Sequence, residues 1–370
     1  KSLGNVISPD KIMKKFGVDI LRLWVVASDY YDDLKLDSSI LNAQTDSYRR
    51  IRNTFRYIIG NLEGFTDKEK IDIKAFPELE QYVLHRLWEV NQIINKSIGE
   101  FNFHLMFTTL LNFCSNDLSS FYFDIRKDAI YCDHPDSNKR RSARTLLDIL
   151  FHCLLRWLAP SLVFTCEEAW MARGNKTSIH LEDFITIDDS FKNERINKKW
   201  EILKDVRKVI TGALEVKRAE KLIRSSLEAS INIYLSPMIF SNIKNIDLAE
   251  LSIISNANII ESENHNGSFS LEEIKGVAVE VKRAPGNKCA RCWQILNEVK
   301  KPEEICIRCK GVINKNIRIL MGKPLIAHTI LQAKEANCFD CIVVSSDSQD
   351  ILDISKEFGV DYVVQRPDEM

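Results

Sequence analysis

The chain has 370 residues, of which 45% are hydrophobic and 28% are charged, a composition typical of a soluble globular protein with roughly two to four domains. Its formal net charge of −1 excludes a globally basic nucleic-acid-binding protein, so any such surface has to be a local patch. The sequence has ten cysteines, no apolar leader and no uncharged run of the roughly 18 residues that a membrane span needs. It therefore predicts a cytoplasmic protein with reduced thiols and no membrane contact.

Three helices are predicted in the first part of the chain. Ser8 and Pro9 begin a short basic helix that ends at Gly17. Asp19 can cap the next helix, in which one stripe at helical spacing is expected to be buried. That stripe consists of Leu21, Trp24, Val25 and Ser28. The third helix, residues 40–64, interleaves aromatic side chains with Arg49, Arg50, Arg52 and Arg56.

Three long helical patterns follow and predict an antiparallel bundle. They span residues 80–99, 104–127 and 142–170, and each is rich in Leu, Phe or Trp at helical spacing. Pro160 should kink or divide the last one, because proline lacks a backbone N–H and clashes with the preceding turn. Residues 128–139 are the expected loop of the bundle. The tryptophans on these stripes, which we expect in the core, are Trp88, Trp157 and Trp170.

After about residue 190 the pattern changes to that of a small mixed α/β domain. A charged amphipathic helix is predicted at 200–221. Strands are predicted at 229–235 and 276–281, where apolar and polar residues alternate.

Two Cys-x-Arg-Cys turns predict a metal site. The four candidate ligands are Cys289, Cys292, Cys306 and Cys309. Four sulfurs at this spacing can surround one zinc ion tetrahedrally and leave no open position for catalysis, so we expect a structural zinc rather than unrelated buried or redox cysteines. Arg291 and Arg308 lie close enough to offset the thiolate charge and could also face an anionic partner.

The last segment, residues 315–370, predicts half of a second α/β domain. Helices at 324–336 and 349–358 alternate with strands at 341–345 and 360–364. Cys338 and Cys341 form a third Cys-x-x-Cys. It has no second pair, and Cys341 opens an apolar strand, so we expect two buried thiols there rather than a metal site.

The beginning of the chain resembles the class I aminoacyl-tRNA synthetases. Lys1-Ser2-Leu3-Gly4-Asn5 is similar to the end of their Lys-Met-Ser-Lys-Ser loop, and Gly17-Val18-Asp19-Ile20-Leu21-Arg22-Leu23-Trp24 is similar to the stem-contact region that follows. The resemblance implies that Lys1 and Ser2 bind ATP and its Mg²⁺. The lysine would neutralise phosphate charge as the aminoacyl adenylate forms.

The middle of the chain resembles one branch of that family. The motifs at residues 47–54, 121–124, 156–160 and 167–170 look like the anticodon-binding bundle of the isoleucine, valine and leucine enzymes. The Cys-x-Arg-Cys-Trp module is similar to that of bacterial isoleucyl-tRNA synthetases. The resemblance implies an isoleucine-accepting tRNA as partner, one structural zinc ion and a monomer. The tRNA-binding candidates are Arg49, Arg50, Arg52, Arg56 and Trp293.

Each of these candidates also has a simpler interpretation. The four arginines can form an ordinary solvated helix face. Trp293 directly follows a zinc cysteine, so it can pack over the metal turn as well as stack on a nucleotide.

The predicted fold is mainly α. Its parts are the loop end and stem-contact region (1–40), the helical anticodon-binding bundle (41–190), a small α/β domain (191–283), a zinc-ribbon-like module (284–312) and a truncated, Rossmann-like α/β segment (315–370). The family's catalytic Rossmann domain, with its His-Ile-Gly-His motif, and its editing domain do not precede Lys1. We therefore expect this polypeptide alone to be unable to form the adenylate.

The C-terminal segment resembles a different family. Residues 315–317, 322–327, 343–347 and 366–367 are similar to the start of the acylneuraminate cytidylyltransferases, which bind CTP through a glycine-rich basic loop. Most of that loop is missing, so we expect no cytidylyltransferase activity. Two alternatives stay open at this point: a cytidylyltransferase with an N-terminal extension, and a non-enzymatic RNA-binding protein derived from a synthetase.

Overall fold

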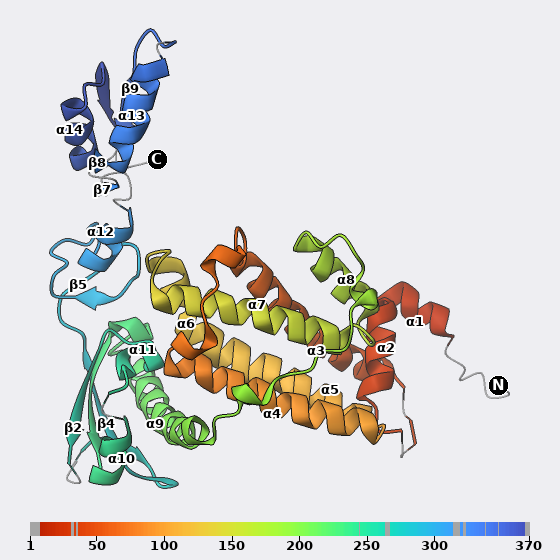
Figure 1. The fold of residues 1–370 in the computed structure, drawn as a ribbon. Coiled ribbons are helices and arrows are strands. Elements are labelled where there is room, and N and C mark those ends of the chain that lie inside the picture. Colours follow the sequence, from red (N-terminus) through yellow and green to blue (C-terminus); the bar gives the residue numbers. More distant parts are fainter. Residues whose placement is uncertain are drawn as a thin grey trace. The chain divides into compact units, whose positions relative to one another are not determined.

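The computed structural model (Figure 1) describes residues 8–30, 33–34, 36–243, 245–262, 267–313, 319–320, 323–336, 338–346 and 348–366. Lys1 and Ser2 lie outside these residues. The described chain is mainly helical with small sheets, as predicted. It divides into two compact units. Unit 1 contains the residues up to Tyr131 and those from Pro135 to Ala284, and unit 2 contains the short loop Cys132–His134 and the residues from Pro285 onward. None of the described helices is long and apolar enough to cross a membrane.

Unit 1 begins with a bundle of helices that matches the predicted bundle in outline. Its long helices are α1 (Pro9–Phe16), α2 (Val18–Ala27), α3 (Ser38–Asn61), α4 (Glu78–Gly99), α5 (Phe103–Asn112), the π-helix η3 (Phe113–Tyr122), α6 (Phe123–Cys132), α7 (Asn138–Leu158) and α8 (Val163–Ala172). Short 3₁₀ turns are η1 (Asp67–Glu69), η2 (Ile73–Ala75), η4 (Ile179–Leu181), η5 (Asp189–Phe191) and η6 (Ser226–Glu228). The largest fully buried side chains of the bundle are Trp157, Tyr122, Phe55, Phe113 and Phe151.

The predicted helix 104–127 is one continuous rod, but its middle is a π-helix that the sequence pattern did not predict. The rod consists of α5, η3 and α6. Because α6 continues to Cys132 and α7 begins at Asn138, the loop is shorter than the predicted 128–139. The expected division at Pro160 is confirmed, since α7 ends at Leu158 and α8 begins at Val163. Trp157 and Trp170 are buried and Trp88 is half-buried.

The role predicted for Asp19 is wrong, and the structure shows a different one. The N-cap of α2 is Gly17, and the buried Asp19 carboxylate instead accepts hydrogen bonds at the start of α8. It receives the Thr165 N–H at 2.8 Å, the Thr165 hydroxyl at 2.6 Å and the Phe164 N–H at 3.3 Å. Arg22 donates to the Pro160 and Ser161 carbonyls of the same junction. A carboxylate is favourable at a helix N-terminus because the N–H groups there lack partners within the helix.

The predicted apolar stripe of α2 is also wrong. Val25 is 56% exposed, and the buried positions are Asp19, Ile20 and Leu23. The other predicted members, Leu21, Trp24 and Ser28, are only half-buried. The most buried side of α2 is the one that carries Asp19, whose carboxylate bonds to α8.

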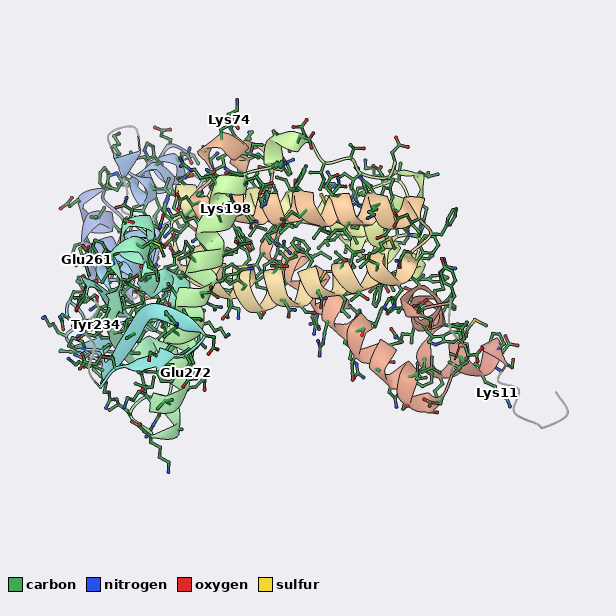
Figure 2. The ribbon with its side chains drawn as sticks, turned by 90° about the horizontal axis from the view of Figure 1, so that it is seen from below. Lys11, Lys74, Lys198, Tyr234, Glu261 and Glu272 are labelled. Carbon is green, nitrogen blue, oxygen red and sulfur yellow. The ribbon has the colours of Figure 1, made fainter. Side chains whose placement is uncertain are left out.

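The small mixed domain completes unit 1. A four-stranded sheet has the order β2-β1-β4-β3, in which β1 pairs parallel with β2 and antiparallel with β4. Its elements are α9 (Glu194–Ala219), β1 (Ala229–Leu235), α10 (Pro237–Ile243), α11 (Leu248–Ser252), β2 (Asn256–Glu261), β3 (Phe269–Leu271) and β4 (Ile274–Arg283). Alternate residues of β1 are buried, and α9 packs on β3 and β4. Figure 2 shows Lys11 on α1 and Lys198 on α9 at opposite ends of this unit.

One buried ion network joins the bundle to the small domain inside unit 1. Arg126 on α6 is 3% exposed and donates to both carboxylate oxygens of the fully buried Glu80 on α4, at 2.6 and 2.8 Å. Its remaining nitrogen donates to Glu250 on α11 at 2.8 Å, and Lys139 reaches the other oxygen of Glu250. Burial opposes the charge, but the carboxylates outweigh it and raise the pKa of Arg126. The phenol of Tyr122 donates a further hydrogen bond to Glu80.

Unit 2 contains two small structures besides the Cys132–His134 loop. Its elements are β5 (Asn287–Lys288), β6 (Ile295–Leu296), α12 (Ile307–Ile313), β7 (Ile319–Leu320), β8 (Lys323–Pro324), α13 (Leu325–Ala336), β9 (Val343–Ser346), α14 (Gln349–Glu357) and β10 (Tyr362–Gln365). Strands β9 and β10 pair in parallel across the crossover helix α14, in agreement with the predicted α/β pattern. Of the residues that resemble the cytidylyltransferases, 315–317, 322, 347 and 367 lie outside the described residues.

The prediction that Cys338 and Cys341 are buried is wrong. Both thiols are exposed. They lie in the connection between α13 and β9, and the strand begins only at Val343, so no sheet covers them.

Removal of the buried guanidinium should strongly destabilise unit 1. We expect Arg126→Ala to lower the free energy of unfolding by about 3–5 kcal/mol, because Glu80 would be left as a buried charge without its partner. Urea denaturation followed by circular dichroism measures this loss. The control is Lys96→Ala, which removes an exposed pair with Glu100 and should cost less than about 1 kcal/mol. A similar small cost for both variants would contradict the proposed role of Arg126.

Candidate metal centre and nucleic-acid interface

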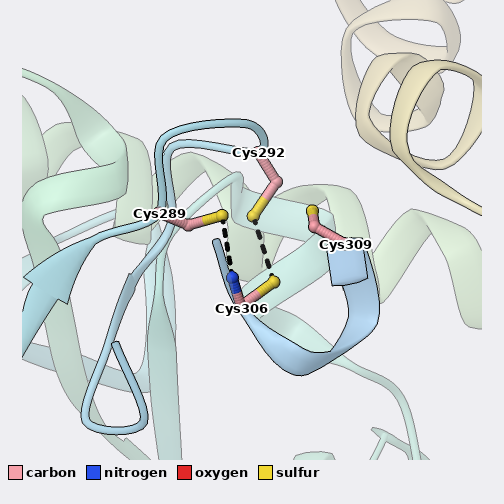
Figure 3. A group of neighbouring side chains, drawn as sticks. All are labelled: Cys289, Cys292, Cys306 and Cys309. Carbon is pink, nitrogen blue, oxygen red and sulfur yellow. Dashed lines mark hydrogen bonds between the residues drawn. The ribbon is translucent and has the colours of Figure 1, made fainter. Parts of the chain in front are cut away.

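The four predicted cysteines come together in unit 2. One ligand atom from each of Cys289, Cys292, Cys306 and Cys309 lies within 4.8 Å of all the others, and all four residues are buried (Figure 3). The first pair lies on the turn between β5 and β6, and the second pair lies where α12 begins. Four sulfurs this close match the tetrahedral ligand set of a structural zinc ion.

Backbone hydrogen bonds give the two turns their shape. The Trp293 N–H donates to the Cys289 carbonyl at 3.0 Å, and the Cys289 N–H donates to the Gln294 carbonyl at 2.9 Å. The Cys306 N–H points at the Cys289 sulfur at 3.3 Å (Figure 3). Gly286 precedes β5 with φ +108°, and a Cβ there would lie 2.3 Å from the Leu296 carbonyl oxygen. Only glycine therefore allows the hairpin to close.

The thiols of the cluster have unequal acidities. Burial opposes ionisation of Cys289, but backbone N–H groups of Cys292, Cys306 and Arg291 outweigh it and lower its pKa to about 6. Burial raises the pKa values of Cys292 and Cys309, and neighbouring sulfur charges add to that rise. Like charges at such distances repel one another, and a divalent cation among them removes the repulsion.

The arginines of the two turns have partners within unit 2. Arg291 donates to the Cys132 carbonyl at 2.8 Å, and Arg308 lies 3.4 Å from the Asp133 carboxylate. The suggestion that these guanidinium groups face an anionic partner is therefore not supported by their contacts. Cys132 itself is buried in the same apolar cluster as the four candidate ligands.

Trp293 lies at the surface of the metal turn. Its side chain is 59% exposed and its φ is +67°, in the left-handed region that non-glycine residues seldom adopt. The Lys288 ammonium lies 4.9 Å from the centre of the indole ring. Strained residues of this kind are concentrated at functional sites. An exposed aromatic ring beside a cation can stack on a nucleobase.

The four arginines of α3 are all exposed. Arg49 forms an ion pair with Asp46 at 3.1 Å, and Arg52 lies 3.9 Å from Glu168 of α8. No ion pair is found for Arg50 or Arg56 within the part of the chain that the structure describes. The opposite face of α3 packs in the core through Ile51, Phe55 and Ile58. The packed helix α3 therefore presents two exposed guanidinium groups, those of Arg50 and Arg56, that form no ion pair with the described residues.

Sequence reasoning missed polar residues next to these arginines. The exposed side chains of Asn116, Ser119 and Ser120 lie on η3, which packs against α3. The signal was the stretch from Ser115 to Ser120, in which every residue except Leu118 is polar and which interrupts the apolar helical pattern. The candidate ATP ligands, Lys1 and Ser2, lie outside the described residues.

Three family models match the chain. Residues 80–233 match the anticodon-binding domain of tRNA ligase, and residues 1–37 match the class I tRNA synthetases of the I, L, M and V group. Residues 307–370 match the cytidylyltransferase model. The last match begins inside the second cysteine turn.

Several curated relatives match over most of the chain. The isoleucine–tRNA ligase of Pelagibacter ubique is 46% identical over 304 residues, which is 81% of this chain and 32% of the relative. The ligase of Zymomonas mobilis is 39% identical, and the match covers 85% of this chain and 33% of that ligase. The ligase of Agrobacterium fabrum is 44% identical, and the match covers 81% of this chain and 31% of that ligase. This chain thus spans about a third of the length of these relatives. A solved LeuRS–tRNA–LeuAMS complex from Agrobacterium radiobacter is similar in fold over 64% of this chain and 24% of the matched chain. Its TM-score of 0.42 and sequence identity of 16% are too low to support an inference.

The metal site should hold one zinc ion per chain. We expect Cys306→Ser to abolish zinc binding and to unfold the module, because the remaining three sulfurs no longer complete the ligand set. Elemental analysis by mass spectrometry on the purified protein measures the zinc content. The control is Cys338→Ser, which alters an exposed thiol outside the cluster and should leave one zinc bound. Full zinc content in the Cys306 variant would contradict the assignment of the four ligands.

Proposed function

We propose that this chain, which is homologous to the isoleucine–tRNA ligases over 81% of its length, is the C-terminal, tRNA-binding part of such a ligase. The observation that carries the proposal is the exposed arginine face of α3. This helix precedes residues 80–233, the range that matches an anticodon-binding domain, and packs against η3 and α7 of that range. The proposed partner is an isoleucine-accepting tRNA.

The bundle supplies a rigid and locally basic surface. Although the net charge of the chain is −1, Arg50 and Arg56 have no carboxylate partner among the described residues. The neighbouring aspartate and glutamate bind Arg49 and Arg52 only at an exposed surface, where such pairs contribute little. The packed helix fixes the backbone from which these guanidinium groups extend, and their planar geometry suits contacts with phosphates.

In the proposed complex, the zinc module supplies a second contact with the tRNA. In the proposed role, zinc is structural and holds the turn that exposes Trp293, and the indole ring stacks on a base of the tRNA. Lys288 beside the ring adds positive charge near the phosphate backbone. Zinc takes no part in the chemistry, because four sulfurs fill its coordination positions.

The activity of the complete ligase is part of the proposal. The reaction is the ATP-dependent activation of isoleucine, followed by its transfer to the 3′ end of tRNA. Lys1 and Ser2 contribute phosphate contacts of the Mg²⁺-bound ATP, and the remaining catalytic parts are those of the two thirds of the ligase that this chain does not span. We propose a monomer in the cytoplasm.

The match of residues 307–370 to a cytidylyltransferase model favours a second candidate function. The described part of this segment contains one βαβ unit, β9-α14-β10, and a preceding helix α13. We favour the tRNA-binding role, because the isoleucine–tRNA ligase relatives match over far more of the chain. Turnover of CTP by the purified chain would revive the second candidate.

Neutralisation of the arginine face should reduce the salt dependence of tRNA binding. Each phosphate contact contributes about −0.7 to −0.9 to the slope of log K against log salt concentration, so Arg50→Gln with Arg56→Gln should flatten the slope by about 1.5. Filter binding of an isoleucine tRNA transcript at several salt concentrations measures it. The control, Lys96→Gln, removes an exposed charge from α4 and should leave the slope unchanged. Equal slopes for the arginine variant and the wild type would remove these residues from the interface.

Replacement of Trp293 separates stacking from folding. We expect Trp293→Gly to weaken tRNA binding about ten-fold without loss of stability, because the stacking surface is lost while the strain at φ +67° is relieved. Trp293→Phe should retain most of the affinity. Both affinities can be measured by fluorescence anisotropy on labelled tRNA, with zinc content as the check on folding. Unchanged binding by the glycine variant, with zinc bound, would show that the ring does not contact tRNA.

A further inference from the structure

The connection between α13 and β9 carries two exposed thiols. Of the ten cysteines in the chain, Cys338 and Cys341 are exposed and the other eight are buried. Phe339 and Asp340, which separate the two, are exposed as well. Because a dissolved oxidant reacts with thiols that it can reach, this pair is the accessible sulfur of the chain.

The eight buried cysteines are protected in other ways. Burial raises the pKa of Cys114 and of Cys153 to about 12, and it raises the pKa of Cys166 well above the usual range of a thiol. At neutral pH these three side chains are thiols rather than the reactive thiolates. The four cysteines of the candidate metal centre form the buried cluster of Figure 3, where a zinc ion would hold their sulfurs. Cys132 is buried in the same apolar cluster.

The backbone between the two exposed thiols favours their approach. Cys338 and Cys341 are three positions apart, and a fully extended chain would separate their Cα atoms by about 10 Å. A disulfide needs a Cα separation of roughly 4.4–6.8 Å, which a reversal of four residues provides. The chain bends at Asp340, between the two cysteines. The bend brings the two Cα atoms closer than an extended chain would.

No hydrogen bond among the described residues opposes closure of a ring between the two sulfurs. Residues 338–341 make no hydrogen bond or ion pair with the described part of the chain. The contacts that anchor this region begin at Ile342, whose N–H donates to the Asp361 carboxylate at 2.7 Å and whose carbonyl accepts from the Asp361 N–H at 2.9 Å. The pairing of β9 with β10 begins at Val343, after the ring. Joining the sulfurs therefore leaves the strand pairing intact.

We propose that Cys338 and Cys341 form a reversible dithiol–disulfide pair, a redox modification site that hydrogen peroxide oxidises and small thiols such as glutathione reduce. The thiolate of one cysteine attacks a peroxide oxygen, the O–O bond breaks, and a sulfenic acid forms while the departing hydroxide takes up a proton to become water. The second thiol loses its proton, its sulfur attacks the sulfenic sulfur, and the hydroxide that leaves becomes a second water. Two thiols and one peroxide thus give one disulfide and two waters, as two electrons pass from sulfur to oxygen.

Reduction closes the cycle. Two glutathione molecules return two electrons and two protons by thiol–disulfide exchange and leave as glutathione disulfide. Exposed and strained disulfides are the ones that small thiols reduce easily, and a ring across two intervening residues is both exposed and tightly constrained. The inference is independent of the tRNA-binding role, because the pair lies in the segment that matches the cytidylyltransferase model.

Peptide mapping of the full, zinc-loaded chain tests the proposal. The chain is treated with an equimolar amount of hydrogen peroxide, unfolded, labelled with N-ethylmaleimide and digested with trypsin. Residues 335–356 form one tryptic peptide that contains both cysteines and no other. We expect this peptide to lose the mass of two hydrogen atoms and to take up no maleimide, about ten-fold faster than any other cysteine is oxidised. Incubation with glutathione before labelling should restore both labels.

Two variants identify the bond. Cys341→Ser should abolish the loss of two hydrogen atoms, because Cys338 then has no second sulfur on the same connection. The matched control, Phe339→Ala, changes an exposed side chain between the two sulfurs and should retain the loss.

Three results would overturn the proposal. One is a fully labelled 335–356 peptide after the cysteines of the metal centre have been oxidised. The second is a sulfinic acid on Cys338 or Cys341 without a link between them. The third is a disulfide between two chains on a non-reducing gel in place of the ring within one chain.

Discussion

The buried guanidinium of Arg126 is the contact on which the architecture of unit 1 depends. It joins Glu80 of α4 to Glu250 of α11, and so connects the helical bundle to the small α/β domain through a guanidinium and a Glu80 carboxylate that are both buried. A network of this kind adds little stability over an apolar core of the same volume, but removing one partner leaves the other as an uncompensated buried charge. The buried face of α3, with Ile51, Phe55 and Ile58, belongs to the same packed core as α4 and α6. The core therefore fixes the backbone of the helix that carries the exposed arginines.

A different constraint organises the first part of unit 2. The apolar cluster there contains Val299 and five cysteines, with Leu296 and Ile305 packed against it, which is too little to stabilise a module of this size. In the proposed role, zinc ligation by the four cysteines would replace the missing core. Backbone hydrogen bonds around Cys289 hold the turn in which Trp293 adopts a positive φ.

The sequence predicted those features that arise from local periodicity or spacing. Strand β1 matches its predicted bounds, the helix division at Pro160 is confirmed, and the four cysteines of the doubled motif meet. Features that depend on distant partners were not predictable. Asp19 caps a helix that begins 144 residues later in the sequence (163 − 19), and Arg291 contacts a carbonyl 159 residues away. The π-helix was missed because an apolar pattern at helical spacing does not distinguish it from an α-helix. The similarity to isoleucine–tRNA ligases extends over 81% of this chain, whereas the roles of the individual arginines are proposals.

Hydrogen–deuterium exchange on the full chain, with and without isoleucine tRNA, tests the central claim most directly. The account predicts slower exchange on tRNA binding in α3 and in the turn around Trp293, because these segments carry the proposed contacts. It predicts no change in α13 and α14, which belong to the segment that resembles a cytidylyltransferase. Protection confined to α13 and α14, or the absence of protection in α3 at saturating tRNA, would contradict the claim that the bundle is the tRNA-binding surface.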